Sequence, residues 1–412
     1  MRVWALVGLV ICHTADWHLG RTLHGASFEV AHRRFLAWLV ALIAARAVDV
    51  LIVAGDVFDR SVPSAAAEAL FYGFLSELAR VAPGTQVIVV AGNHDGPARL
   101  AAPAPLLSFL GSAHLGAAAR LPVTIVASLP ITKDGAIDVE SLVVPLRTRA
   151  GVVRGRLIAV PFLRPSDLSR AGVEAEASAI ERARAIHTRL VRAAEGEGLL
   201  IATGHGQLRG ARLSPESERP LLGGDEAALP IDVFPRAIDY VALGHLHLAQ
   251  SLDEGRVRYA GAPLPLAFSE RHYPHQVVIA REGEDARGLT IDEVRVPRFV
   301  ELVRVEGEGG APLSLEDALR ALAALRHREV EVGEREAEVR ANEAEVGERW
   351  VQVRVRLASP RAALKRELTE ALEGARQTKL VSVDVVRDDA SLVPQSLSVS
   401  DELAPDAVLA RV

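Results

Sequence analysis

The stretch Val50–Asp59, VLIVAGDVFD, runs from an unbroken apolar segment directly into two carboxylates. An apolar run without alternation is typical of a strand that is covered on both faces. Two similar runs flank it, at Leu9–Cys12 and Val87–Ala91. Helical patterns fill the intervals, at Glu29–Ala45 and Ala65–Arg80. This alternation of strand and helix predicts a layered α/β core.

The same kind of pattern continues along the chain. Short strands are predicted at Leu157–Val160, Leu199–Thr203, Tyr240–Leu243, Val257–Ala260 and Gln276–Ala280, and a helix at Glu174–Ala194. Residues 1–296 are therefore predicted to form one domain.

The pattern changes near Pro297. Beyond it, strands are predicted at Val300–Val305, Val351–Leu357 and Leu380–Arg387, and helices at Leu315–Arg326 and Arg361–Leu372. We predict a smaller α+β domain over residues 297–390. Residues 391–412 are predicted to be a partner-binding segment that has a polar, Ser-containing linker and ends in a short amphipathic helix.

A seven-residue repeat, EVGEREA, EVRANEA and EVGERWV, lies inside the smaller domain, within residues 329–350. A coiled coil needs about three or four heptads with strong apolar residues at two positions, and glycines interrupt this repeat. A solvated helical extension is favoured, and the role of the repeat stays open.

Composition narrows the classes of function. The chain has 412 residues, 49% hydrophobic and 24% charged, with a net charge of −6 and a pI near 6.1. No overall basic charge attracts nucleic acid, which leaves room for a partner that supplies a positive surface. Cys12 has no second cysteine to pair with, so nothing ties the chain to an oxidising compartment.

Targeting signals are weak. The opening MRVWALVGLV resembles a signal peptide, but it continues into a strand and its exit loop without a cleavage site. An extended first strand or an upstream start codon is favoured over export. No other apolar run approaches the ~18–20 residues that span a bilayer. We expect a soluble, cytoplasmic protein.

Metal-binding residue types cluster where the predicted strands end. Open α/β sheets bring these loops together, so side chains from different loops converge. The candidates are Asp16, His18, Asp56, Asn93, His205, His245 and His247, with His94 beside them. Any one of them alone is more often a turn residue than a ligand. Their joint presence at successive strand ends favours a metal site.

The donor types indicate what the site is. Imidazole, carboxylate and amide ligands without thiolate exclude a closed structural zinc cage and suit Mn, Fe or Zn. The seven candidate ligands are too many for one ion, but they suit two ions if one carboxylate bridges them. Two ions ~3.5–4 Å apart can hold the attacking and leaving oxygens of a phosphoryl displacement. His94, not needed as a ligand, is then free to act on the leaving oxygen.

The motifs D-x-H, GD-x-x-D, GNHD, GH and GH-x-H occur in this order and resemble the calcineurin-like metallophosphoesterase superfamily. The longer segments HTADWHLGRTLHG, VAGDVFDRSVPS, VVAGNHDGPARL, IAVPFLRPSDL, IATGHGQLRGAR, DYVALGHLHLAQ and RYAGAPLPLAFSE resemble the bacterial SbcD family, the nuclease subunits of SbcCD complexes. The match runs from about Val10 to Glu270. It implies a layered calcineurin-like phosphoesterase core with a smaller capping domain.

The resemblance also implies roles for the candidate residues. One ion would be held by Asp16, His18 and His247 and the other by Asn93, His205 and His245, with Asp56 bridging and His94 acting on the leaving group. The ions are expected to be Mn²⁺. The expected activity is double-strand exonuclease and single-strand endonuclease cleavage of DNA, with the ATPase SbcC, in a heterotetramer of two nuclease and two ATPase subunits.

Two other functions stay open. The first is a small-molecule or protein phosphoesterase of the same superfamily, which the motifs around the ligands disfavour. The second is a DNA-end tethering scaffold with an inert site, which the complete ligand set disfavours. The chain departs from the SbcD pattern in about its first nine residues and in the heptad insert, both away from the candidate ligands.

Other polar residues have competing interpretations. Asp59 and Asp95 either orient a ligand or shape a turn. His13 is predicted to be a packed polar residue. The remaining histidines are predicted at the surface: His24, His32, His114, His187, His272, His275 and His327. Arginines that either contact phosphate or line a solvated hairpin are Arg147, Arg149, Arg154, Arg156 and Arg164; Arg209 and Arg212 have the better claim to phosphate.

Overall fold

The computed structural model describes residues 8–110, 121–170, 172, 174, 176–214, 228–283, 288–336, 347–387 and 396–398. The chain divides into two compact units. The first unit comprises Met1–Arg21, His32–Pro263 and His272–Val296, and the second comprises Thr22–Ala31, Leu264–Arg271 and Pro297–Val412.

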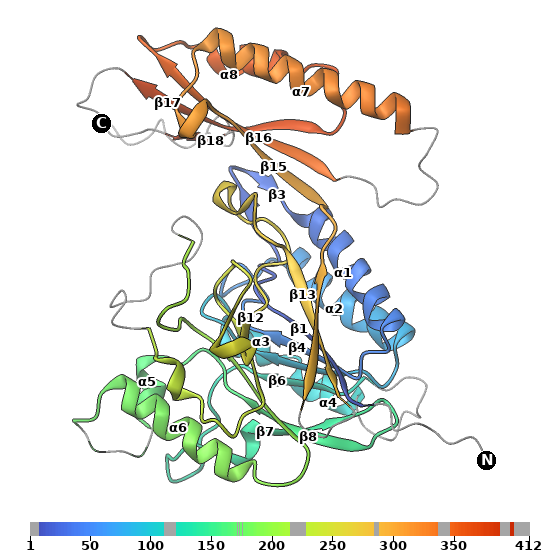
Figure 1. Ribbon diagram of the computed structural model, residues 1–412, viewed down its shortest axis with the longest axis vertical. Coiled ribbons are helices and arrows are strands. Elements are labelled where there is room, and N and C mark those ends of the chain that lie inside the picture. Colours follow the sequence, from blue (N-terminus) through green and yellow to red (C-terminus); the bar gives the residue numbers. More distant parts are fainter. Residues whose placement is uncertain are drawn as a thin grey trace, which may run out of the picture. The chain divides into compact units, whose positions relative to one another are not determined.

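The first unit contains two six-stranded sheets (Figure 1). The first sheet consists of β1 (Val10–Thr14), β4 (Val50–Ala54), β5 (Gln86–Val90), β6 (Val123–Val126), β13 (Gln276–Glu282) and β14 (Leu289–Arg295). Its order is β14-β13-β1-β4-β5-β6. The strands from β1 to β6 are parallel, and β13 and β14 are antiparallel at one edge. All residues of β1, β4 and β5 are buried, which explains their unbroken apolar sequences.

The second sheet of this unit also has six strands. It consists of β7 (Val143–Arg147), β8 (Val153–Ala159), β9 (Leu199–His205), β10 (Tyr240–Gly244), β11 (Gln250–Leu252) and β12 (Val257–Tyr259). The order is β11-β12-β10-β9-β8-β7, with parallel central strands and an antiparallel strand at each edge.

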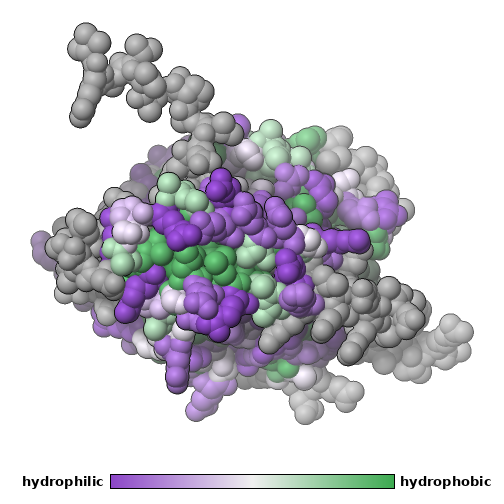
Figure 2. Space-filling view, turned by 90° about the horizontal axis from the view of Figure 1, so that it is seen from above, coloured by the Kyte–Doolittle hydropathy of each residue, from purple (hydrophilic) through white to green (hydrophobic). Residues whose placement is uncertain are grey.

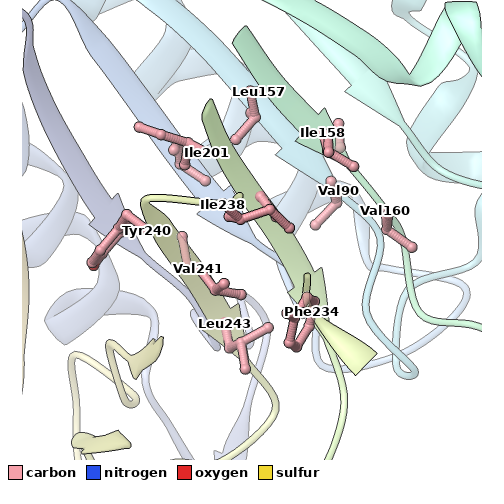
Figure 3. Close-up of a cluster of buried hydrophobic side chains, with 14 of the residues drawn as sticks. Val90, Leu157, Ile158, Val160, Ile201, Phe234, Ile238, Tyr240, Val241 and Leu243 are labelled. Atoms are coloured by element: carbon pink, nitrogen blue, oxygen red, sulfur yellow. The ribbon is translucent and has the colours of Figure 1, made fainter. Parts of the chain in front are cut away.

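The two sheets share one apolar core. Figure 3 shows part of it, where Ile158 of the second sheet lies beside Val90 of the first, and Leu157, Ile201 and Val241 belong to the same cluster. His13 adds a polar link, since its ring lies 3.0 Å from the hydroxyl of Tyr240 and 3.1 Å from the carbonyl of Leu243. The prediction that His13 is a packed polar residue is confirmed.

Helices cover the sheets and follow local capping signals. Figure 1 shows α1 and α2 on the opposite side of the unit from α6. The helices are α1 (Glu29–Ala45), α2 (Ala65–Val81), α3 (Pro97–Ala101), α4 (Ala104–Leu110), α5 (Pro165–Leu168) and α6 (Ala179–Ala193). Ser178 and Glu181 form a capping box, so α6 begins at Ala179 and not at Glu174 as predicted.

The second unit has its own sheet and core. The sheet order is β15-β16-β17-β18, with β18 antiparallel to β17. Its elements are β15 (Val300–Val305), α7 (Leu315–Glu336), β16 (Glu348–Leu357), α8 (Leu364–Glu370), β17 (Thr378–Arg387), β18 (Ser396–Ser398) and the hairpin of β2 (Thr22–Leu23) and β3 (Ala26–Ser27). Phe28 joins the hairpin segment to this unit, because its ring packs 4.6 Å from that of Trp350.

One face of the molecule carries a group of hydrophobic side chains (Figure 2). On the face drawn in Figure 2, a central group of hydrophobic side chains is surrounded by hydrophilic ones. Within the described ranges, no helix is long and apolar enough to cross a membrane.

The predicted layered α/β architecture is confirmed, with errors at the sheet edges. The four edge strands β6, β7, β11 and β14 were not predicted, because their mixed burial leaves no continuous apolar run. The polar linker predicted near residue 396 is wrong there, since β18 pairs with β17. The heptad insert begins as part of α7, and residues 337–346 and the tail helix predicted at 401–412 lie outside the described residues.

The surface prediction is wrong for three histidines. His32, His187 and His275 are buried. Each ring donates to a backbone carbonyl, of Trp17 (2.9 Å), Ala183 (2.8 Å) and Ala262 (2.9 Å) respectively, which offsets part of the loss of hydration. His24 is half-buried, His272 and His327 are exposed as predicted, and His114 lies outside the described residues.

Candidate metal centre

Loops from five parallel strands of the first unit converge at one edge. Backbone hydrogen bonds join the loop after β1 to the loop after β4: Asp16 donates to the carbonyl of Gly55 (3.0 Å) and His18 to that of Asp56 (3.0 Å). Across the second sheet, Gly206 donates to Gly244 (3.3 Å). These backbone hydrogen bonds fix the positions of the loops independently of their side chains.

Two glycines allow this close approach. A Cβ atom at Gly55, which has a φ of +91°, would lie 2.2 Å from Nδ1 of His205. A Cβ atom at Gly92 would lie 2.1 Å from Oδ1 of Asp56. Any larger residue would push apart the side chains that the strands bring together.

The backbone is strained at several predicted ligands. Asp16, His18, Asp56 and His245 have φ values of 54°, 48°, 50° and 99°. Non-glycine residues adopt this region infrequently, at a free-energy cost of about 1–3 kcal/mol each. The surrounding loop contacts hold these residues in the left-handed conformation.

All the predicted metal ligands come together in this edge. Ligand atoms of Asp16, His18 and His247 lie within 4.8 Å of one another, as do those of Asp16, Asp56 and His205. All of these residues are buried. The site therefore assembles side chains from both sheets, which are far apart in the sequence.

Asn93 and His245 complete the group. The carboxamide oxygen of Asn93 lies 3.0 Å from Nε2 of His205 and 3.1 Å from Nδ1 of His245. The backbone N–H of His245 donates to both carboxylate oxygens of Asp16, at 3.0 and 3.1 Å. Asn93 is half-buried and His245 is buried.

The protonation of His205 tests whether these residues suit a cation. Its Nδ1 donates to the carbonyl of Ala54 (2.8 Å), so the neutral ring carries a lone pair on Nε2. That lone pair faces the oxygen of Asn93 at 3.0 Å and Oδ2 of Asp56 at 3.4 Å. Oxygen and nitrogen lone pairs repel unless a proton or a metal ion lies between them, so the arrangement fits a cation.

His18 gives a second, independent test. Its ring is buried, and neither nitrogen has a hydrogen-bond partner among the described residues. Nε2 lies 3.6 Å from Oδ2 of Asp56, and Nδ1 lies 3.5 Å from Oδ1 of Asp59. Buried polar nitrogens without partners are costly, and coordination of an ion by one of them would remove that cost.

Burial and charge together set the pKa values in the site. Burial raises the pKa of Asp16 to about 7 and lowers those of His18 and His245 to about 4 and about 3. Burial also disfavours the charged forms of His205 and Asp56, but the attraction between these two charged groups is stronger than this effect. The attraction raises the pKa of His205 to about 9 and holds the pKa of Asp56 below its usual range.

Asp59 and Asp95 differ in role. Asp95 accepts backbone hydrogen bonds from Gly92 (2.9 Å), Val57 (3.2 Å) and Phe58 (3.0 Å), so it holds together the two loops that carry the predicted ligands Asp56 and Asn93. Burial raises its pKa to about 6. Asp59 lies beside the ring of His18 and accepts a hydrogen bond from Arg21 (3.2 Å). Asp95 thus shapes the loops, and Asp59 is placed to orient His18.

His94 keeps one ring nitrogen available. Its backbone N–H donates to Oδ1 of Asp56 (2.8 Å), and its Nδ1 donates to the carbonyl of Asp59 (2.8 Å). Its ring lies 4.7 Å from that of His18. Nε2 therefore remains for exchange of a proton within the cluster.

Two arginines of the predicted basic stretch make structural contacts. Arg154 pairs with Glu282 (2.7 Å), and Arg156 donates to the carbonyls of Glu195 and Glu197. These contacts support the hairpin interpretation for both arginines. Arg164 differs, because its guanidinium lies 5.7 Å from the centre of the Phe162 ring.

Phe162 was not predicted as a site residue. Its ring lies 6.3 Å from that of His205, and its backbone N–H donates to Ala91 (2.8 Å). The sequence signal was its place directly after the strand that ends in IAVP, the position that identified the other site residues.

Comparison with known proteins agrees with this geometry. The family model for calcineurin-like phosphoesterases matches residues 9–249, more than half of the chain. The SbcD protein of Rhodobacter capsulatus, which is named as a component of the nuclease SbcCD, is 43% identical over 311 residues, covering 74% of this chain and 73% of its own. The chain belongs to the SbcD family of calcineurin-like phosphoesterases. It is therefore a metal-dependent phosphodiesterase of the nuclease type.

Other SbcD-family relatives agree. The corresponding SbcD proteins of Escherichia coli K12 and Bacillus subtilis are 35% and 32% identical, over 72% and 73% of this chain and 71% and 73% of their own. Among solved structures, a dimetal phosphatase from Danio rerio is similar over 70% of this chain and 99% of its own, at 13% identity and a TM-score of 0.37.

Gly92→Ala tests the packing of the SbcD-family site. The added Cβ atom would displace Asp56, so we expect Mn²⁺ affinity to fall about 10–100-fold. Gly206→Ala is the matched control, because a Cβ atom there meets nothing within 4 Å although it follows His205. Titration calorimetry of metal-stripped protein measures both, with a thermal melt to verify folding. Equal affinities in the two variants would contradict the packing argument.

Proton release tests the electrostatics. Because the pKa of His205 is raised to about 9, its ring is protonated at pH 7.5, and a metal ion at Nε2 must displace that proton. Apparent affinity for Mn²⁺ should therefore rise about tenfold per pH unit up to pH 9 and fall as the pH falls. Calorimetry in two buffers of different ionisation enthalpy reports the released protons. Identical heats in both buffers would show that no proton leaves.

Proposed function

We propose that this chain is the DNA-cleaving subunit of a two-metal nuclease. Asp16, His18 and His247 would hold one ion, and Asn93, His205 and His245 the other, with Asp56 shared by both. The observation that supports this most strongly is the convergence of buried ring nitrogens and carboxylate oxygens from both sheets, with both ring nitrogens of His18 lacking a hydrogen-bond partner among the described residues. The SbcD relatives, which are named as parts of a nuclease, support DNA as the substrate.

The bound ions would supply Lewis acidity and an activated water for attack on a phosphodiester. The residues of this chain supply position and proton transfer. Ala54 holds the His205 ring in the tautomer that leaves Nε2 free to bind, and Asp59 orients His18. His94, fixed through its own Nδ1, keeps Nε2 to protonate the leaving oxygen.

The finer features of the proposal follow the SbcD resemblance. The ions are Mn²⁺, and the activities are double-strand exonuclease and single-strand endonuclease cleavage in DNA repair, recombination and replication. The partner is an SbcC-type ATPase, in an assembly of two nuclease and two ATPase subunits. An acidic chain with a net charge of −6 gains from a partner that contributes positive surface.

Asp56→Ala tests the central role of the shared carboxylate. We expect Mn²⁺-dependent degradation of end-labelled duplex DNA to fall by about 100-fold or more, with and without the ATPase and ATP. Asp134→Ala, which removes an exposed carboxylate, should retain wild-type activity. Hydrolysis of bis-p-nitrophenyl phosphate by a wild-type chain that never cleaves DNA would keep the metal chemistry and overturn the substrate.

Truncation after Ser398 tests the partner-binding tail. This cut keeps β18, which pairs with β17, and removes only residues 399–412. We expect loss of co-purification with the ATPase, because the predicted amphipathic helix lies in the removed segment, with hydrolysis of bis-p-nitrophenyl phosphate unchanged. Undiminished co-purification would place the ATPase-binding surface elsewhere on the chain.

A further inference from the structure

A second concave site lies in the first unit, outside the metal centre. It is a pocket of about 440 Å³ between the two outermost strands of each sheet, β11 and β12 in one and β13 and β14 in the other. The lining includes Arg212, Arg258, Gln276, Glu293 and Arg295. Its volume is in the range of pockets that hold small organic ligands.

The charge of the lining favours an anion. Arg258 pairs with Glu293 across the two sheets at 2.7 Å, which closes one side of the pocket. Arg212 and Arg295 are exposed, and neither is paired with a carboxylate within the described part of the chain. Two unpaired guanidinium groups on one pocket rim are suited to bidentate binding of a phosphate group.

Gln276 supplies a specific polar feature. The residue is 3% exposed, yet its Oε1 is buried without a hydrogen-bond partner among the described residues. Gln276 pairs directly with Arg295 across β13 and β14, so both side chains lie on the same face. An unpaired buried carbonyl oxygen is costly, and a ligand N–H or O–H at this point would remove the cost.

The pocket is connected to the ligand-bearing loops. Tyr259, also in the lining, donates its hydroxyl to the carbonyl of Gly206 (2.9 Å) and accepts from the backbone of Leu208 (3.0 Å). Gly206 directly follows His205. Gln250 fixes the backbone of Arg212 from both sides, through its oxygen (2.8 Å) and its nitrogen (2.9 Å). One wall of the pocket thus supports the loop that carries a predicted metal ligand.

We propose that this pocket binds one nucleotide unit, with its phosphate on Arg212 and Arg295 and a donor of its base or sugar on Oε1 of Gln276. The unit belongs either to the DNA strand being cut or to a free mononucleotide. That the nucleotide belongs to a DNA strand rests on the proposed nuclease function. That the pocket binds a nucleotide rests on the residues of the pocket alone.

The test compares binding of two probes, a single-stranded oligonucleotide and deoxyadenosine 5′-monophosphate, in EDTA so that nothing is cleaved. The double variant Arg212→Ala/Arg295→Ala should bind more weakly by about tenfold or more. For the oligonucleotide, the slope of the logarithm of the binding constant against the logarithm of the salt concentration should become less steep by about 0.7 for each phosphate that is no longer bound. Gln276→Leu should bind about threefold to tenfold more weakly, with its salt dependence unchanged. Arg80→Ala, an exposed arginine of α2, is the control.

Each outcome has a defined meaning. Weaker binding of the oligonucleotide places the DNA strand in the pocket, and weaker binding of the mononucleotide alone assigns it to a free nucleotide. Wild-type affinity of both variants for both probes, with unchanged hydrolysis of bis-p-nitrophenyl phosphate, overturns the proposal. If the wild-type chain cleaves no DNA but the variants bind the mononucleotide more weakly, the nuclease function fails and the pocket assignment holds.

Discussion

The carboxylate of Asp56 is the group on which the rest of the site depends. Its Oδ2 lies 3.4 Å from Nε2 of His205 and 3.6 Å from Nε2 of His18, and its Oδ1 accepts the backbone N–H of His94. A buried negative charge is tolerated only where donors or cations surround it. The loops of both sheets supply that environment, so the fold and the charge of this one residue are mutually dependent.

The close approach of the loops around Asp56 restricts which residues and backbone conformations the neighbouring positions can adopt. Two neighbouring loops must pass so closely that only glycine fits at positions 55 and 92. The predicted ligands Asp16 and Asp56 adopt a left-handed backbone, which the well-packed parallel strands beneath them must stabilise. Rigid apolar strands such as β4 are therefore part of the chemistry, because they fix the points from which the strained loops depart.

The sequence predicted the features that combine an apolar strand with a loop at the carboxyl edge of the sheet. The buried strands β1, β4 and β5 have continuous apolar sequences. Loops at the carboxyl ends of such strands meet at one edge of the sheet, which predicts that Asp16, Asp56 and the later histidines lie together. All the predicted ligands lie in one cluster.

What the sequence could not indicate depends on long-range contacts. The packing of Phe28 against Trp350 assigns an N-terminal hairpin to the second unit, and no local pattern predicts a contact across that separation. The buried histidines were misplaced for the same reason, since a carbonyl acceptor such as that of Ala262 is provided by the tertiary fold. Edge strands with mixed burial, such as β14, carry too weak a periodicity to be recognised.

Substrate choice must arise outside the metal cluster. Imidazole, carboxylate and amide ligands can promote hydrolysis of many phosphoesters, so they do not distinguish a DNA strand from a small diester. Discrimination requires groups that contact the substrate beyond the scissile bond. In an acidic chain, unpaired arginines beside the ligand loops are the groups suited to that task, because local positive charge can bind a phosphate even where the overall field repels it. Arg212 and Arg295, which line the pocket proposed to bind a nucleotide unit, are therefore better placed than the metal cluster to distinguish one phosphoester from another.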